Sequence, residues 1–159
     1  MDYIYVFQTV SYSIPSPPRC HLLDRLFRQL ISLDLPAGEF AIFGSGPLII
    51  RGVIPAANDL DIICRGAAWE RAKLIGTVQH SDEYGVTIAT IYDGQISFGT
   101  EWGIGIFDVD NLIDGADMIG GLPFVQLRHV ISYKMERASP KDLRHIEALK
   151  NSDYSGETD

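Results

Sequence analysis

The chain has 159 residues, of which 46% are hydrophobic, and this length suits one compact domain with its own core. Its 13 lysines and arginines against 21 aspartates and glutamates give a formal charge of −8, which argues against a nucleic-acid partner because phosphates would be repelled. The sequence contains neither a signal peptide nor a run of about 18 uncharged apolar residues, so we expect a cytoplasmic protein without a membrane anchor.

The first third of the chain predicts a strand, a helix, a second strand and a short helix. Residues 3–14 are rich in aromatic and β-branched side chains, which favours a strand that ends at the following proline-rich stretch. Apolar side chains recur at helical spacing over residues 22–31, which predicts an amphipathic helix that ends before Pro36. The run EFAIFGSG at 39–46 indicates a short buried strand, and GPLIIRG at 46–52 a short helix.

The middle of the chain indicates mixed α and β structure with antiparallel pairing. NDLDIICR at 58–65 predicts a strand, and AAWERAKLIG at 67–76 predicts a helix. A polar loop around His80 follows, and GVTIATIYDGQISFG at 85–99 then alternates around an Asp-Gly pair that is typical of a hairpin turn. FDVDNLID at 107–114 predicts a capped helical turn.

The last third of the chain predicts two helices and a tail. LRHVISYKMERA at 127–138 and PKDLRHIEALK at 140–150 have helical patterns, and a Ser-Pro pair separates them. Residues 151–159 are polar, which favours a disordered tail. We therefore expect a single α+β domain over residues 1–150, in which helices pack against a short mixed sheet.

Two aspartates lie within the apolar run at 58–65. Alternate side chains of a strand share a face, so Asp59 and Asp61 should point to the same side with α-carbons roughly 6.5 Å apart. Two ionised carboxylates at a half-buried position repel each other unless a cation neutralises them. Oxygen ligands without a nearby histidine or cysteine favour Mg²⁺ or Mn²⁺, so we predict a divalent metal site. The alternative is an ordinary loop or helix cap.

The Gly-Ser-Gly turn after the first buried strand is a candidate phosphate site. Exposed backbone N–H groups at a helix start can bind phosphate oxygens, and Ser45 adds a hydroxyl beside Gly44. Magnesium usually completes its ligand shell with water and substrate phosphates, so the turn and the two aspartates fit one site for a metal ion and a phosphate. Arg51 could also contact a phosphate, although a solvated arginine at a helix end is an equal alternative.

This order of elements resembles the nucleotidyltransferase superfamily, particularly its minimal, single-domain bacterial members. The resemblance rests on the strand that ends in Gly-Ser, the short helix and the Asp-x-Asp on the next strand. Four segments strengthen the resemblance and extend it over residues 40–149: GSGPLIIRG, FDVDNLID, GLPFVQLRHVISYK and PKDLRHIEAL. It implies a polymerase-beta-like fold, and metal-dependent transfer of a nucleotidyl group from a nucleoside triphosphate such as ATP to an acceptor hydroxyl.

The resemblance also implies roles for two lysines near the end of the chain. Lys134 and Lys141 match basic positions that recur in this superfamily, and either could reach a triphosphate. For Lys141 the alternative is a helix opening with Pro140 in the first turn. His129 and His145 lie on predicted helices without a ligand partner, so we expect packing or surface roles for them.

A second Asp-x-Asp, formed by Asp108 and Asp110, competes for the metal role. Either aspartate would also serve as an N-cap for the short helix that follows. The spacing of an EF-hand fails because Leu112 occupies the fifth position. We therefore assign the metal role to Asp59 and Asp61.

In the superfamily a third acid on a later strand completes the metal site or serves as the base, and the resemblance places this position at Ser97. Serine is neutral and cannot supply the same charge. Glu101 is the nearest replacement, but four residues along a strand span roughly 13 Å unless the chain turns at Gly99. The sequence therefore keeps Asp59 and Asp61 and replaces the third acid.

This serine separates two hypotheses about function. One is a working enzyme in which Asp59, Asp61 and Glu101 are catalytic and the first two hold the metal, with electrostatic stabilisation of an in-line transfer. The other is a catalytically silent relative that binds nucleotide, or only a protein partner. Proteins with this fold occur as partners in toxin–antitoxin pairs, which makes such a partner one form of the second hypothesis.

Overall fold

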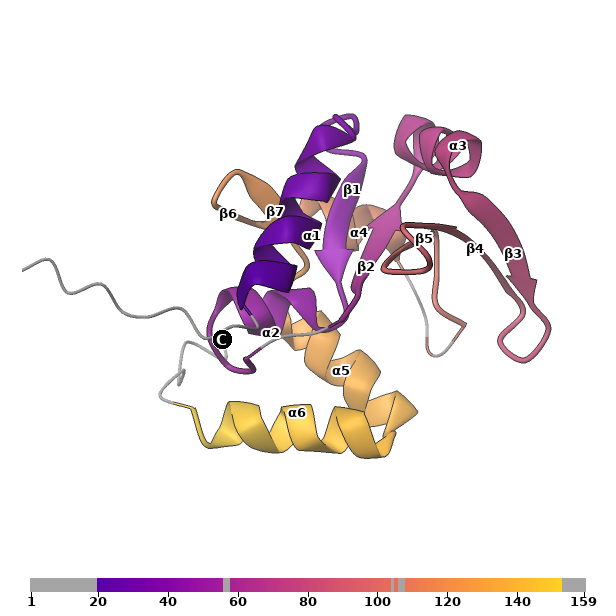
Figure 1. Cartoon of the computed structure of the whole chain (residues 1–159). Coiled ribbons are helices and arrows are strands. Elements are labelled where there is room, and N and C mark those ends of the chain that lie inside the picture. The colour runs from indigo at the N-terminus through magenta and orange to yellow at the C-terminus, as the bar shows by residue number, and fades with distance from the viewer. Residues whose placement is uncertain (1–19, 56–57, 104, 106–107, 153–159) are drawn as a thin grey trace, which may run out of the picture.

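The structure is a computed structural model of the whole chain, shown in Figure 1, and it describes residues 20–55, 58–103, 105 and 108–152. The strand predicted at 3–14 lies outside the described residues, as does most of the tail that is predicted to be disordered. None of the described helices is both long and apolar enough to cross a membrane.

The described residues form one open, mixed sheet of seven strands in the order β3-β4-β5-β2-β1-β7-β6. The strands are β1 (Phe40–Phe43), β2 (Leu60–Cys64), β3 (Thr77–Ser81), β4 (Val86–Ile91), β5 (Ile96–Gly99), β6 (Asp117–Ile119) and β7 (Leu122–Phe124). β1 runs parallel to β7, and β2 runs parallel to β5, whereas the other neighbouring strands are antiparallel.

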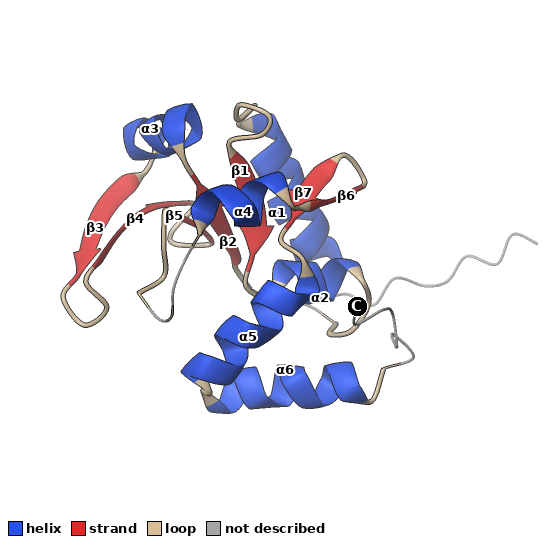
Figure 2. Ribbon diagram, turned by 180° about the vertical axis from the view of Figure 1, so that it is seen from behind, coloured by secondary structure: helices blue, strands red, loops and turns tan. Residues whose placement is uncertain are grey.

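Helices pack on both faces of this sheet, and because most of its strand pairs are antiparallel the domain is α+β. The helices of the described residues are α1 (Cys20–Ser32), α2 (Gly46–Ile50), α3 (Gly66–Ile75), α4 (Val109–Asp114), α5 (Leu127–Arg137) and α6 (Pro140–Lys150). Figure 2 shows α4 lying across one face of the sheet, with α5 and α6 beyond the end of the strands. The α+β class that the sequence predicts is therefore confirmed.

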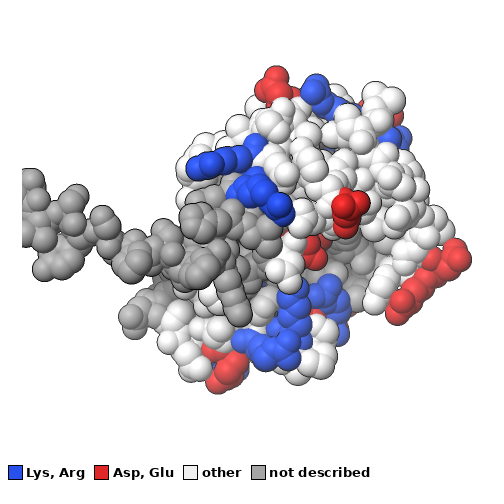
Figure 3. All heavy atoms as spheres, viewed as in Figure 1, with Lys and Arg blue, Asp and Glu red and all other residues white. Residues whose placement is uncertain are grey.

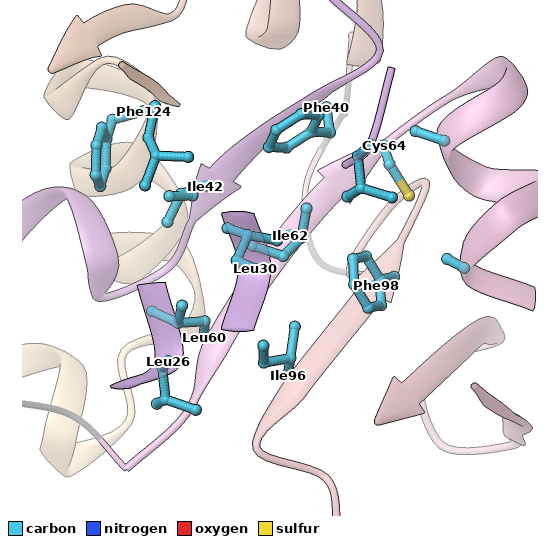
Figure 4. Packing of buried hydrophobic residues seen from close by; sticks show 14 of the residues in the cluster. Leu26, Leu30, Phe40, Ile42, Leu60, Ile62, Cys64, Ile96, Phe98 and Phe124 are labelled. Carbon is cyan, nitrogen blue, oxygen red and sulfur yellow. The ribbon is translucent and has the colours of Figure 1, made fainter. Parts of the chain in front are cut away.

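Each face of the sheet carries its own hydrophobic cluster. On the first face, Leu26 and Leu30 of α1 pack over Leu60 and Ile62 of β2, as Figure 4 shows. On the second face, the cluster joins Ile63 of β2 to residues of α4 and α5. Because side chains alternate along a strand, β2 contributes to both clusters, and Asp61 lies on the second face.

The predicted elements from residue 22 onward are confirmed, with ends that differ by a few residues. Strand β3 and the hairpin β6–β7 are absent from the prediction. β3 is exposed along nearly its whole length, so no hydrophobic alternation marks it. The polar loop expected around His80 is wrong, since His80 lies in β3 with its Nδ1 3.2 Å from Oγ1 of Thr87. β6 and β7 are very short, and β7 contains Pro123, which disfavours a strand.

Candidate functional site

The two aspartates of the predicted metal site lie at the start of β2. Asp59 is exposed and directly precedes the strand, while Asp61 is half-buried within it. Burial, and to a smaller extent the charge of Asp59, raises the pKa of Asp61 from 3.8 to about 6. Three cations oppose this shift, namely Arg137, Lys141 and Lys134. The pair of carboxylates and the basic groups of α5 and α6 therefore share one site.

The Gly-Ser turn contacts the same carboxylate. β1 pairs with β2 so that Phe43 lies opposite Asp61, and Gly44 follows at the end of β1. Gly44 has φ +63°, and a Cβ at this position would lie 2.7 Å from Oδ2 of Asp61. Glycine therefore permits both the turn and the close approach of backbone to carboxylate. Ser45 is buried, and its carbonyl begins α2 by accepting from Leu48 and Ile49, while its hydroxyl makes no cap hydrogen bond.

Ser97 occupies the position beside Asp61 on the neighbouring strand. β5 runs parallel to β2, with Ser97 paired to Asp61, so the two side chains lie on the same face. Glu101 is exposed and follows the end of β5, toward the end of the sheet where β2 reaches Cys64 and away from Asp59. Among the residues the structure describes, no three His, Cys, Asp or Glu side chains gather in a group that could hold a metal ion. The catalytic role of Glu101 stays a prediction.

A buried carboxylate connects α5 to α6 next to this site. Asp142 is 0% exposed and accepts hydrogen bonds from Arg137 at 2.6 and 2.8 Å, from Ser139 at 2.6 Å and from Lys134 at 3.3 Å. Burial alone would raise the pKa of Asp142, but the hydrogen bonds from Arg137 and Ser139 outweigh it and hold this pKa well below 3.8. Ser139 and Asp142 also form a capping box at the start of α6.

Lys134 is held inside this network rather than exposed to solvent. Its side chain is only 3% exposed, and Nζ lies 3.3 Å from Oδ1 of Asp142 and 3.1 Å from Nδ1 of His145. Burial lowers the pKa of Lys134. Lys141, by contrast, is exposed in the first turn of α6. Of the two predicted lysines, Lys141 is therefore the one with its side chain open to a ligand.

Tyr133 fills the space between the strands and the basic groups. Its ring packs edge-on against Phe43, with centroids 5.0 Å apart, and the guanidinium of Arg137 lies 5.3 Å from the ring centroid. Burial raises the pKa of Tyr133, and the charge of Arg137 partly offsets this increase. Figure 3 shows basic side chains gathered beside recessed acidic atoms, over the region that α5 and α6 occupy in Figure 1. Although the chain is acidic overall, this region presents positive charge.

Arg51 contacts residues of α2 and β6. Its side chain is 7% exposed, and it donates to the carbonyl of Pro47 at 2.9 Å and to Asp117 at 2.7 Å. The alternative of a solvated helix-end arginine is therefore wrong. Pro47 and Asp117 therefore each accept from one nitrogen of the guanidinium, and a phosphate contact of Arg51 stays a prediction.

The second Asp-x-Asp has a structural role. Asp108 is the N-cap of α4, where its Oδ1 accepts from the backbone N–H of Asn111 at 3.1 Å. Asp110 and Asp114 both pair with Arg65, at 2.7 and 2.6 Å. The N-cap alternative considered for this motif is confirmed.

A hollow of about 700 Å³ lies elsewhere, at the edge of the sheet near the end of α1, and Leu33, Ile75 and Tyr92 help to line it. It includes none of the residues described above, and among the described residues that line it only Asp93 is acidic or basic. Volume alone does not indicate chemistry, whereas opposed charges and burial converge at Asp61. We therefore place the candidate site at Asp61.

The structure brings seven of the residues considered above to one end of β2: Gly44, Ser45, Asp59, Asp61, Ser97, Lys134 and Lys141. Sequence reasoning missed Arg137, Asp142 and His145 as members of this region. Only the pattern Ser-Pro-Lys-Asp pointed toward Asp142, as a helix opening, because the remaining contacts form between two helices. No family model matches the chain, and no curated protein or solved structure matches it either.

Proposed function

We propose that the protein binds a nucleoside triphosphate together with Mg²⁺ or Mn²⁺ and transfers its nucleotidyl group to an acceptor hydroxyl. The observation that carries this proposal is the half-buried Asp61 carboxylate, packed against the Gly44 turn and facing the basic groups of α5 and α6. The order of strand, Gly-Ser turn, short helix and Asp-x-Asp strand supports a nucleotidyltransferase-like, polymerase-beta-like form of the α+β fold.

The residues present fit a divalent metal. Asp61 has a pKa raised to about 6 beside a second carboxylate, so the pair carries negative charge that its surroundings do not fully compensate. Asp59 and Asp61 would hold the ion through hard oxygen ligands, and the ion would supply charge stabilisation for a transferring phosphoryl group. The backbone of Gly44, the hydroxyl of Ser45 and the ammonium of Lys141 are the groups offered to the triphosphate.

In the proposed reaction the acceptor oxygen forms a bond to the α-phosphorus while the bond to the β-phosphate oxygen breaks, and pyrophosphate leaves. The proton of the acceptor hydroxyl needs a base. Ser97 lies where a carboxylate would be close enough to Asp61 to assist, and a serine hydroxyl does not accept this proton at neutral pH. The proton therefore passes to solvent, and we expect slow turnover.

The same serine favours a second candidate function, a catalytically silent module that binds nucleotide or a protein partner. A partner in a toxin–antitoxin pair is one form of this alternative. Its specific support is that Ser97 pairs directly with Asp61, so the neutral residue stands in the site itself.

Calorimetric titration of each nucleoside triphosphate, with and without Mg²⁺, tests the proposal. We expect binding that requires the metal and that Asp61→Asn abolishes, since this variant removes a ligand charge while keeping the side-chain shape. Asp110→Asn is the matched control, because Asp110 pairs with Arg65 on an exposed surface. If no nucleotide binds, or if Asp61→Asn binds as well as the wild type, the proposal is overturned.

Transfer of a radiolabelled nucleotidyl group to small hydroxyl acceptors, or to the chain itself, then separates the two candidates. Label incorporation supports the enzyme. Metal-dependent binding without release of pyrophosphate supports the silent module.

A further inference from the structure

The Lys134 ammonium has three N–H donors, and two acceptors fix it. Nζ lies 3.3 Å from Oδ1 of Asp142 and 3.1 Å from Nδ1 of His145. An ammonium group can only donate, so Nδ1 of His145 must accept and the imidazole proton must lie on Nε2. Burial, followed by the charges of Lys134 and Lys141, lowers the pKa of His145 to about 4, which agrees with a neutral ring.

Although His145 is neutral, its hydrogen bond helps to set the direction in which the N–H bonds of Lys134 point. Asp142 makes its shorter hydrogen bonds with Arg137 and Ser139, at 2.6 to 2.8 Å, and its contact with Lys134 is the longest of the set. The contact with His145 is shorter than that with Asp142. Because the three N–H bonds of an ammonium have fixed mutual angles, two bound donors also set the direction of the third.

The third N–H of Lys134 has no acceptor among the described residues, and the charge of Lys134 acts on Asp61, whose pKa it lowers. The ammonium thus contributes positive potential to the carboxylate site although its side chain is almost entirely buried. A buried cation of this kind stays charged only while its acceptors are in place.

We propose that His145 is a positioning residue for the nucleotide site: by accepting from Lys134 it keeps the ammonium charged and fixed in place, so that its positive potential acts on the triphosphate bound beside Asp61. This inference rests on the proposed function, and it assigns His145 no contact with the nucleotide. The competing explanation is that His145 only fills space between α5 and α6, which lie side by side in the fold.

Three substitutions at His145 separate the acceptor from the packing. In asparagine, Oδ1 is bonded to Cγ as Nδ1 is in histidine, so His145→Asn keeps an acceptor at the required place. His145→Gln moves the acceptor outward to the place of Nε2, and His145→Leu keeps apolar bulk without any acceptor. His129→Leu, on α5 but outside this network, is the control.

The affinity for ATP with Mg²⁺, measured by calorimetry on the full chain, is the first readout. We expect His145→Asn and His129→Leu to bind as the wild type does, and His145→Leu and His145→Gln to bind about tenfold more weakly, the worth of one hydrogen bond to a charged group. A packing role predicts the opposite order, with leucine the better replacement. If leucine binds as the wild type does, or asparagine binds as weakly as leucine, the inference is overturned.

The second readout does not need nucleotide. A buried, hydrogen-bonded ammonium exchanges slowly with water, so the Lys134 Nζ–H group should give a resolved ¹H–¹⁵N NMR signal, assigned by its loss in Lys134→Met. We expect this signal in the wild type and in His145→Asn, and its loss in His145→Leu, or in His145→Met should the leucine variant not fold. Equal signals in all variants overturn the inference. A wild type that binds no nucleotide overturns the proposed function instead, and the NMR signal still decides the role of His145.

Discussion

Asp61 places a carboxylate in a half-buried position beside a second carboxylate, so its ionisation destabilises the folded chain. Its pKa of about 6 lies above the ordinary 3.8, so the folded state retains a proton that the unfolded state has lost between these two values. The contribution of Asp61 to stability therefore falls as the pH rises from about 4 to about 6.

We expect Asp61→Asn to raise the free energy of unfolding by about 1–2 kcal/mol at neutral pH, less than the full pKa shift allows because part of the side chain contacts water. The gain should disappear below about pH 4, where the carboxyl is protonated in both states. Urea denaturation at both pH values measures it. A gain of the same size at both pH values would mean that the substitution acts through packing.

The backbone conformation of Gly44 allows the Asp61 carboxylate to lie close to it. Gly44→Ala adds a Cβ at φ +63° and places it 2.7 Å from Oδ2 of Asp61. Gly38 has φ +80° with nothing within 4 Å, so Gly38→Ala measures the backbone cost alone, about 1 kcal/mol.

We expect Gly44→Ala to cost about 2–3 kcal/mol, because the carboxylate or the turn must move as well. Chemical denaturation of the two alanine variants provides the comparison. Similar losses at the two glycines would show that the approach of the Gly44 backbone to Asp61 is not constrained.

At the scale of elements, the junction between α5 and α6 depends on one buried carboxylate. Asp142 holds Arg137 and Lys134 of α5 and caps α6 through Ser139, so it fixes both helices at once. Because its pKa lies below the ordinary value, this stabilisation is complete above about pH 4 and is lost as the pH falls toward the pKa of the folded state.

We expect Asp142→Asn to lower the free energy of unfolding by about 2–3 kcal/mol at neutral pH, since it leaves the buried Lys134 ammonium without its counter-charge. The loss should shrink as the pH is lowered below about 4. Thermal and urea denaturation measure both effects. Asp110→Asn, at a more exposed ion pair with Arg65, should cost no more than about 0.5 kcal/mol. Equal losses for the two variants would refute the buried role of Asp142.

At the scale of the whole molecule, the sheet brings together residues that lie far apart along the chain. A substitution at Ser97 tests whether this position and Asp61 act as one site. Ser97→Asp adds a carboxylate beside Asp61, which should lower the melting temperature in the absence of metal because the clustered charges repel. Added Mg²⁺ should restore the melting temperature. At a Mg²⁺ concentration ten times the Kd, the free energy of unfolding should rise by about 1.4 kcal/mol.

Ser97→Asn is the matched control for this variant, because it has the same shape without the charge. Melting curves of the wild type and both variants, with and without Mg²⁺, give the comparison. If Mg²⁺ raises the melting temperature of Ser97→Asp no more than that of Ser97→Asn, a side chain at this position does not join the aspartate pair.

Local patterns in the sequence determined much of the fold and one half of the site. Helical spacing of apolar residues gives α1, with Leu26 and Leu30 buried and Arg28 exposed. The two-residue period of a strand predicts that Asp59 and Asp61 point to one side, although Asp59 directly precedes β2 in the structure. An Asp-Gly pair gives the hairpin of β4 and β5. β3 was not predicted because an exposed edge strand needs no hydrophobic alternation.

The other half of the site was decided by contacts between distant segments. The parallel register of β2 and β5 places Ser97 beside Asp61, and the packing of α5 on α6 buries Lys134 against His145. Arg51 has the same sequence character as a phosphate-binding arginine, yet tertiary structure pairs it with Asp117. Periodicity fixes which face of an element a side chain occupies, because it depends only on backbone geometry. Which partner that face meets depends on how the elements pack, and packing is determined by the whole core.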